Sequence, residues 1–263
     1  MNQQILEKRL SNLPLGGIKY FDTIDSTNTR AIEFIQKDVP DRFLIIANEQ
    51  SNGRGRAGNT WFTPPDSALA FSLIIYPKKH FQLDNIIRIT GLGSLAVCEG
   101  LRNTYHLQPQ IKWPNDVLLD GKKVSGILAE GHWVGEKLLA VIVGIGINVA
   151  SESVPDENKI DFPATSIHDS LGQPVDRLDV LAEILTRFFF WEEKITEPEF
   201  ITTWQKYMAF IGQSIQIKHK NEILQKGKLI GIDDQGMLVL QHEDGEESII
   251  FTGEIHLRPT IDR

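Results

Sequence analysis

The sequence is poor in cysteine and contains no long apolar run. Cys98 is the single cysteine among 263 residues, so the chain cannot form an internal disulfide, which fits a reducing compartment. No stretch approaches the ~18 apolar residues of a membrane-spanning helix. Residues 1–15 alternate polar and apolar side chains and lack an apolar core of signal-peptide length. We therefore expect a soluble, cytoplasmic protein.

An excess of positive charge and several familiar catalytic motifs are also missing. The 27 Lys and Arg residues against 35 Asp and Glu residues give a formal charge of −8, which argues against bulk nucleic acid as the main partner. The sequence has no Gly-x-Ser-x-Gly nucleophile elbow, and its seven histidines are dispersed without metal-ligand spacing. Cys98 falls in the middle of an expected helix, so nucleophilic catalysis has no candidate.

The most informative stretch that is present is residues 53–61, Gly-Arg-Gly-Arg-Ala-Gly-Asn-Thr-Trp. Its glycines allow positive φ angles and the close approach of a ligand. Arg54 and Arg56 carry planar charged groups suited to carboxylate or phosphate, and Trp61 adds a large flat ring. The stretch is interpreted either as a loop that folds over an anionic ligand or as a surface turn with solvated arginines.

Apolar periodicity divides the chain into two units, residues 1–212 and 213–263. In the second unit, short alternating runs over 214–258 predict a small antiparallel barrel or sandwich. The polar stretch 150–174, which contains three prolines, is expected to be a long connection. In the first unit the pattern predicts strands at 18–21, 43–47, 68–76, 125–130 and 138–149, and helices at 2–13, 83–105, 176–195 and 198–208.

Three further segments have both a structural and a functional interpretation. Ser26 and Thr27 precede an apolar helical pattern, so helix capping is favoured over ligand binding. Lys112 and Asp116 suit an anion or Mg²⁺ site, but taken alone a hairpin with one surface ion pair is favoured. The glycines of the segment 144–148 indicate close approach by a ligand or backbone. A dinucleotide-binding fingerprint is rejected there because no helix follows.

Six segments, each weak alone, form a joint signature in one order over roughly residues 18–258. They are Ser26-Thr27-Asn28, residues 53–58 with Trp61, Lys112-Trp113-Pro114-Asn115-Asp116, Gly126-Ile127-Leu128 with Glu130, residues 144–148, and Gly253-Glu254-Ile255 with Leu257-Arg258. Together they resemble the biotin protein ligases, also called biotin–[acetyl-CoA-carboxylase] ligases.

The resemblance implies an α+β fold. A mixed-sheet catalytic domain of the class II synthetase-like, biotin–lipoate ligase type would span residues 1–212, and an SH3-like β-barrel would span 213–263. It also implies an ATP-dependent ligase that forms biotinyl-5′-AMP and transfers biotin to a specific lysine of a biotin carboxyl carrier protein. The expected ligands are biotin, ATP and Mg²⁺, with the metal ligands unassigned. A monomer or homodimer without a membrane or specific DNA partner is expected.

The resemblance further implies a role for each matched residue. Lys112, Arg56 and Asp116 are expected to be catalytic, with Lys112 reaching the biotin carboxylate and the α-phosphate. Biotin binding is expected from Ser26, Thr27, Asn28, Gln50, Arg54, Gly55, Arg56, Lys112, Gly144 and Gly146. Nucleotide binding is expected from Trp61, Asn115, Lys123 and Asn148.

The sequence also departs from the family pattern, and two alternatives stay open. Ala57 stands where many members carry a basic residue, so the loop is less cationic. Roughly 20 residues precede the first matching strand, too few for the winged helix of repressor members, so no operon repression is expected. The alternatives are a lipoate or octanoate ligase and a biotin-responsive binding protein. The intact Gly-Arg loop favours biotin, and the retention of Lys112 and Arg56 favours catalysis.

Overall fold

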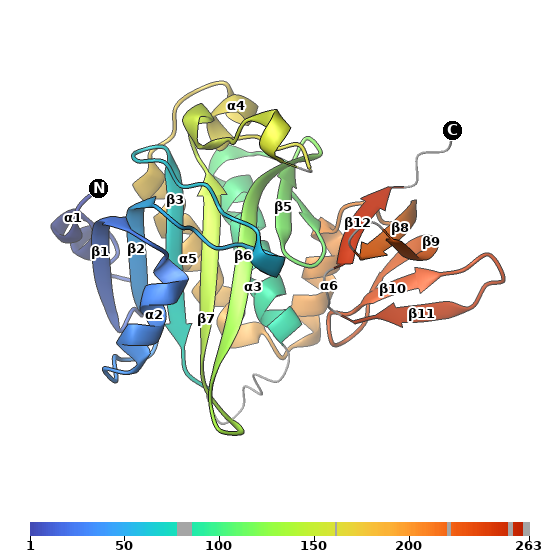
Figure 1. Cartoon of the computed structure of the whole chain (residues 1–263), viewed down its shortest axis with the longest axis horizontal. Helices are drawn as coiled ribbons and strands as arrows, with labels where there is room; N and C mark the ends of the chain where they lie inside the picture. The colour runs from blue at the N-terminus through green and yellow to red at the C-terminus, as the bar shows by residue number, and fades with distance from the viewer. Residues whose placement is uncertain (78–85, 161, 220–221, 252–254, 260–263) are drawn as a thin grey trace.

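A seven-stranded mixed sheet forms the centre of the molecule (Figure 1). The computed structural model describes residues 1–77, 86–160, 162–219, 222–251 and 255–259. The sheet has the strand order β1-β2-β3-β7-β6-β5-β4. Its strands are β1 (Gly17–Ile24), β2 (Phe43–Gln50), β3 (Ala68–Ile75), β4 (Gln110–Lys112), β5 (Asp116–Leu119), β6 (Lys122–Val134) and β7 (Lys137–Asn148).

The pairing of these strands places glycines beside one another in the middle of the sheet. β1 and β2 are parallel, and every other neighbouring pair in the sheet is antiparallel. β6 and β7 form a long hairpin in which Gly126 is paired with Gly146, and Leu128 is paired with Gly144. On the other side of β7, Gly146 is paired with Ala70 of β3. Small residues on three adjacent strands therefore leave room for other groups to lie against the sheet.

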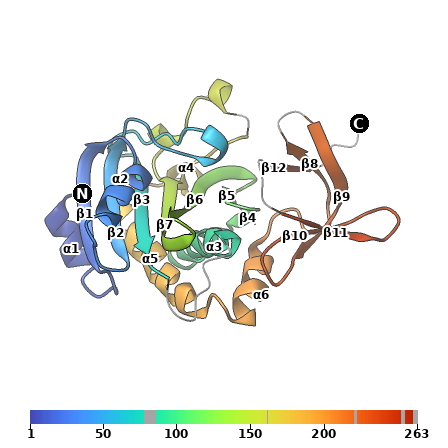
Figure 2. The same ribbon diagram turned by 60° about the horizontal axis from the view of Figure 1, so that its bottom comes forward.

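Helices cover both faces of the sheet because its strands carry apolar side chains on both faces. α3 (Ile86–Tyr105), α5 (Arg177–Lys194) and α6 (Pro198–Tyr207) contribute to one large apolar core, together with Leu44 and Ile46 of β2. The intervening Ile45 faces a smaller core, which it shares with Ala31 and Ile35 of α2 (Thr27–Ile35). Figure 2 shows α2 on one side of the sheet and α3 and α5 on the other. Cys98 is buried in α3, as the sequence predicts.

The predicted helices and strands are confirmed with small shifts in their ends. The short N-terminal helix α1 covers Gln3–Arg9, and the predicted helix start at residues 83–85 lies outside the described residues. The prediction that 150–174 is only a connection is wrong in part. This segment contains two short 3₁₀ helices, Ser151–Ser153 and Glu157–Lys159, and the helix α4 (Ile167–Leu171). Ser166 caps α4 through its hydroxyl and Gly172 ends it in a left-handed conformation, φ 76°.

The C-terminal unit is a five-stranded antiparallel sheet of the order β11-β10-β9-β8-β12. Its strands are β8 (Ser214–His219), β9 (Glu222–Ile232), β10 (Leu238–Gln241), β11 (Glu247–Ile250) and β12 (Ile255–Pro259). Alternate residues such as Ile215, Ile217 and Leu229 are buried, as the period-two pattern predicts. Gly253 and Glu254 of the C-terminal motif lie outside the described residues. The α+β fold with a small β unit after a mixed-sheet domain is confirmed.

Candidate active site

Two adjoining cavities lie where the loop 51–61 covers β6 and β7. The first has a volume of about 370 Å³ and the second about 470 Å³. Both are lined by Trp61, Lys112, Asp116 and Lys123, so these side chains form a common wall. Asn148 lines the second cavity. The first cavity brings together the other predicted site residues: Ser26, Thr27, Asn28, Gln50, Arg54, Gly55, Arg56, Trp61, Lys112, Asn115, Asp116, Lys123, Gly144 and Gly146.

Hydroxyl and amide groups at the start of α2 form a buried polar network at one end of the first cavity. The Thr27 amide N–H donates to Gln50 Oε1 over 2.8 Å, and Gln50 Nε2 donates to Thr63 Oγ1 over 3.0 Å. Ser72 Oγ lies 2.7 Å from Thr27 Oγ1 and 2.6 Å from Asn28 Oδ1. These side chains are thereby held in fixed rotamers beside the cavity.

The prediction that this segment begins a helix is correct, but the prediction that a side chain caps the helix is wrong for Ser26. Ser26 is the N-cap residue of α2, but its side chain makes no capping hydrogen bond. Ser26 is 2% exposed and lines the cavity, where its hydroxyl is available to a ligand. The segment therefore begins the helix and also lines the cavity.

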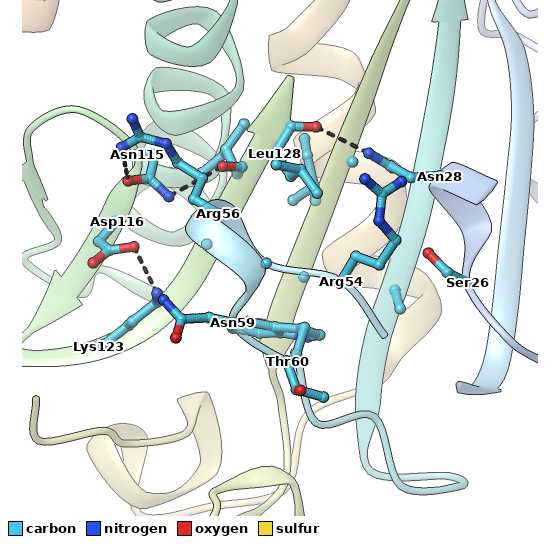
Figure 3. Close-up of a pocket in the computed structure, with 18 of the residues that line it drawn as sticks. Ser26, Asn28, Arg54, Arg56, Asn59, Thr60, Asn115, Asp116, Lys123 and Leu128 are labelled. Atoms are coloured by element: carbon cyan, nitrogen blue, oxygen red, sulfur yellow. Dashed lines mark hydrogen bonds and ion pairs between the residues drawn. The ribbon is translucent and has the colours of Figure 1, made fainter. Parts of the chain in front are cut away.

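The loop that carries the arginines is held at two points, by Glu130 of β6 and by Asn115, which precedes β5; Figure 3 shows the contact with Asn115. Arg54 Nη2 lies 2.6 Å from Glu130 Oε1, and Glu130 Oε2 accepts a 2.8 Å hydrogen bond from Asn28 Nδ2. Arg56 Nη1 donates to Asn115 Oδ1 over 3.1 Å. Burial lowers the pKa of the Arg56 guanidinium, an effect that the nearby Asp116 carboxylate opposes. Both arginines thus point a charged group toward the cavity edge.

Positive φ angles in the loop fall on one glycine and one alanine, and not on every glycine as the sequence suggested. The positive φ angles fall on Ala57, at 54°, and on Gly58, at 79°. Gly55 is extended, with φ −116° and ψ −176°. At Gly53 a Cβ atom would collide with the Trp61 carbonyl oxygen. The two backbone segments are held this close because the Trp61 amide donates a 2.9 Å hydrogen bond to the Gly53 carbonyl. Close approach of the backbone explains Gly53 and a left-handed turn explains Gly58.

Two lysines converge on one buried carboxylate. Asp116 Oδ1 lies 2.6 Å from Lys123 Nζ, and Asp116 Oδ2 lies 3.4 Å from Lys112 Nζ. Burial raises the pKa of Asp116, but the two ammonium groups outweigh it and hold that pKa below its usual value. The side chains of Lys112 and Asp116 are 8% and 13% exposed, so the expected surface ion pair is wrong. The cluster supplies one net positive charge to the wall between the cavities.

Trp61 lies flat against the glycines of β6 and β7. A Cβ atom on Gly146 would overlap the Trp61 indole, and one on Gly126 would lie 3.1 Å from it. Lys123 Nζ stands 5.5 Å from the centre of the Trp61 ring, within reach of a cation–π contact. The Trp61 indole N–H is buried and has no hydrogen-bond partner among the described residues. The glycines of this segment therefore admit an aromatic ring, which is the close approach that the sequence predicts.

Sequence reasoning missed two members of the site. Ser72 is completely buried and links Thr27 to Asn28, yet it lies in a strand that reads Ala-Leu-Ala-Phe-Ser-Leu-Ile-Ile. A single hydroxyl in an otherwise apolar buried strand is a usable signal, because a buried polar group needs a partner. Glu130 belongs to a matched segment, but its contact with Arg54, 76 residues earlier, leaves no local trace in the sequence.

The described side chains include potential metal ligands such as Asp116. Over the part of the chain that the structure describes, no group of three or more His, Cys, Asp or Glu side chains gathers in one place. Asp116 is the carboxylate of the common wall, and both of its oxygens are engaged by lysines. A hard cation such as Mg²⁺ prefers six oxygen ligands, so this wall suits an anion better than a bare metal ion.

A mixed sheet with a basic cavity under a Gly-Arg loop, followed by a small β unit, defines a class of ligase that handles carboxylate and phosphate groups. Residues 20–148 match the model of the biotin/lipoate A/B protein ligase family, and residues 210–258 match that of the biotin protein ligase C-terminal domain. The chain belongs to the biotin protein ligases, as its sequence predicts.

Known relatives are similar to this chain over most of its length. A bifunctional ligase/repressor from Bacillus spizizenii is 34% identical over 245 residues, which are 90% of this chain and 73% of the relative. A biotin–[acetyl-CoA-carboxylase] ligase from Paracoccus denitrificans is 31% identical, over 86% of this chain and 94% of its own length. A biotin protein ligase from Aquifex aeolicus, solved in complex with biotin and ATP, has 30% identity and a TM-score of 0.80, and covers 93% and 99% of the two chains. Among the described helices, none is long and apolar enough to cross a membrane.

Proposed function

We propose that this chain activates biotin with ATP as biotinyl-5′-AMP and transfers the biotinyl group to a specific lysine of a carboxyl carrier domain. The observation that carries the proposal is the wall shared by the two cavities. Lys112 and Lys123 stand in it, so a carboxylate in one cavity and a phosphate in the other would meet at the same cations. The ligase relatives and the solved complex with biotin and ATP support this choice of substrates.

In the first step, a carboxylate oxygen of biotin attacks the α-phosphorus of ATP, and the bond to the leaving pyrophosphate breaks. Two anions must approach each other, and their repulsion is the main obstacle that the site has to reduce. Lys112 takes the position between the cavities, and Arg56 approaches from the loop. Asp116 holds the two lysine side chains in place rather than contacting the substrates.

In the second step, the neutral amine of the acceptor lysine attacks the carbonyl carbon of the mixed anhydride. The carbon–oxygen bond breaks, AMP leaves, and the amine loses its proton. Water would destroy the anhydride, so the loop 51–61 has to cover it until the acceptor arrives. The Arg54–Glu130 and Arg56–Asn115 contacts are the ones that hold the loop over the cavity.

The remaining residue roles follow from the two cavities. Thr27 and Gln50 would face the ureido end of biotin, and Gly144 and Gly146 make room for the Asn28 side chain and the Trp61 ring, which line the first cavity. Trp61, Lys123 and Asn148 line the second cavity and would face the nucleotide. Mg²⁺ would enter with the nucleotide, whose phosphate oxygens are its usual ligands, and would neutralise the pyrophosphate. The domains would be 1–212 and 213–263, with Gly212 in a left-handed turn, φ 78°, at the boundary.

The test is the intact mass of an apo carrier domain after incubation with this protein and Mg·ATP. Parallel samples contain biotin, lipoate, octanoate or no acid. We expect a mass gain with biotin alone. A gain with lipoate or octanoate would move the chain to the sister class of ligases. No gain, together with no biotin-dependent release of pyrophosphate, would leave a protein that only binds.

A further inference from the structure

The strand that carries Lys112 is held on one side by the segment that follows α6 and on the other side by the C-terminal unit. Before Lys112, the Ile111 carbonyl accepts a 2.9 Å hydrogen bond from the amide of Ala209, in the segment that leaves α6 for the β8 strand. After it, the Trp113 indole Nε1 donates a 2.9 Å hydrogen bond to the carbonyl of Gly236. Gly236 belongs to the turn between β9 and β10. Lys112 is therefore bracketed by two contacts that originate far along the sequence.

The turn that accepts the Trp113 bond is itself rigid. Asp233 Oδ1 accepts from the amides of Gln235, at 2.9 Å, and Met237, at 2.8 Å. Gly236 has φ 80°, a conformation that glycine adopts without strain. The Trp204 ring of α6 lies so close to Gly236 on one side and to Gly91 of α3 on the other that neither could carry a Cβ atom unchanged. The Gly236 carbonyl is thus a fixed point.

We propose that Trp113 is a positioning residue for the adenylation step. Its hydrogen bond to Gly236 fixes the backbone that follows β4, and this orients the neighbouring Lys112 ammonium between the two cavities. The C-terminal unit thereby contributes to the first chemical step by holding a strand in place from a distance. The inference rests on the proposed function, because it concerns the alignment of Lys112 with biotin and ATP.

Two buried tryptophans provide a matched pair of variants. Trp113 and Trp191 are 2% and 3% exposed, and each indole N–H donates one hydrogen bond, over 2.9 Å to the Gly236 carbonyl and over 2.8 Å to Glu99 Oε2. Each change to Phe replaces the indole with a smaller ring and removes one hydrogen bond, but Trp113→Phe breaks the contact with the turn and Trp191→Phe leaves it intact. Biotin-dependent pyrophosphate release by the full chain should show kcat reduced by about tenfold to a hundredfold for Trp113→Phe, since small misplacements of catalytic groups have such effects. The KM values should stay near those of the wild type, and Trp191→Phe should keep its kcat.

A variant in the turn tests the same link without touching either tryptophan. Asp233→Ala removes the acceptor that shapes the turn, so it should lower kcat in the same way as Trp113→Phe. The two changes combined should lower kcat no further than the stronger one alone, because they break one connection. If Trp113→Phe fails to fold, Asp233→Ala carries the test with the same readout.

The failure of this inference is distinct from the failure of the proposed function. Equal kcat values for Trp113→Phe and Trp191→Phe, or equal losses of kcat that follow their thermal unfolding midpoints, would overturn the positioning role. Additive losses for Asp233→Ala and Trp113→Phe would do the same. Wild-type protein without biotin-dependent pyrophosphate release would overturn the proposed function, and the inference with it.

Discussion

At the scale of single residues, a comparison of two lysines separates the effect of a charge inside the site from the effect of a charge on the surface. Lys112 lines both cavities, whereas Lys122 is exposed at the start of β6. Lys112→Ala should lower biotin adenylation by roughly 10²–10³-fold, because it removes a preorganised cation from the reacting carboxylate and phosphate. Biotin affinity, measured by calorimetry, should be largely retained, and Lys122→Ala should behave as wild type. Equal losses of affinity and adenylation would contradict the catalytic role of Lys112.

Glu130 is the residue that couples the loop to the polar network. Glu130→Gln should weaken its contact with Arg54, whose partly exposed ion pair contributes up to ~1 kcal/mol. Free biotinyl-5′-AMP should then escape about two- to fivefold faster, which chromatography of the reaction mixture measures. Glu136→Gln, an exposed change in the β6–β7 turn, is the control. Unchanged release in Glu130→Gln would mean that the loop closes without this contact.

Asp116 gives a prediction about acid stability. Its pKa is lower in the folded protein than in the unfolded chain, so the unfolded state binds more protons in the window below about pH 4. The stabilisation is present above that window and is lost as the pH falls through the folded pKa. Asp116→Asn should therefore show a shallower loss of unfolding free energy below about pH 4.

The same variant should also be less stable at neutral pH, by on the order of 3 kcal/mol, because the Lys112 and Lys123 ammonium groups lose the carboxylate that they share. Urea unfolding at a series of pH values measures both effects. Asp120→Asn, in the exposed β5–β6 turn, should follow the wild-type curve. An Asp116→Asn curve parallel to the wild type at acid pH would contradict the assignment.

At the scale of elements, the glycines of β6 and β7 act as a unit with Trp61. Gly146→Ala would place a methyl group inside the space of the indole, whereas the contact at Gly126 is a looser 3.1 Å. Gly146→Ala should therefore displace Trp61 and weaken ATP binding more than Gly126→Ala does. Titration of the nucleotide against both variants measures the difference. A larger effect at Gly126 would contradict the observed ring position.

The sequence predicts elements well where periodicity is strong and poorly where local chemistry decides. The run at 138–149 is a continuous apolar strand, and the structure places β7 at Lys137–Asn148. The five-residue α4 was missed because two apolar positions, Ile167 and Leu171, are too few to show a period. Its hydroxyl cap and its glycine end were readable, but prolines on both sides favoured a loop.

At the scale of the whole molecule, the residues of the site were predictable but most of their partners were not. Arg54, Lys112 and Asn28 stand out through motif resemblance, and the structure brings them around one cavity. Glu130, Ser72 and Gly236 contribute contacts that depend on strand register or on the placement of the C-terminal unit. A linear pattern specifies which groups are available, whereas the pairing of distant segments decides which of them meet.

Because Trp61 lies in the wall between the cavities, its intrinsic fluorescence should report on the occupation of both. Trp191 and Trp204 are buried in the core, and Trp133 is 54% exposed on the β6–β7 hairpin, so their emission should be insensitive to the cavities. The buried Trp113 borders the first cavity but not the second. The half-buried Trp61 indole, by contrast, changes surroundings whenever either cavity is filled. Fluorescence should shift on addition of biotin and again on addition of ATP. Trp61→Phe should abolish the shift on ATP and reduce the shift on biotin to the contribution of Trp113, and Trp133→Phe should leave both shifts unchanged. Fluorescence would then allow loop closure to be followed in real time.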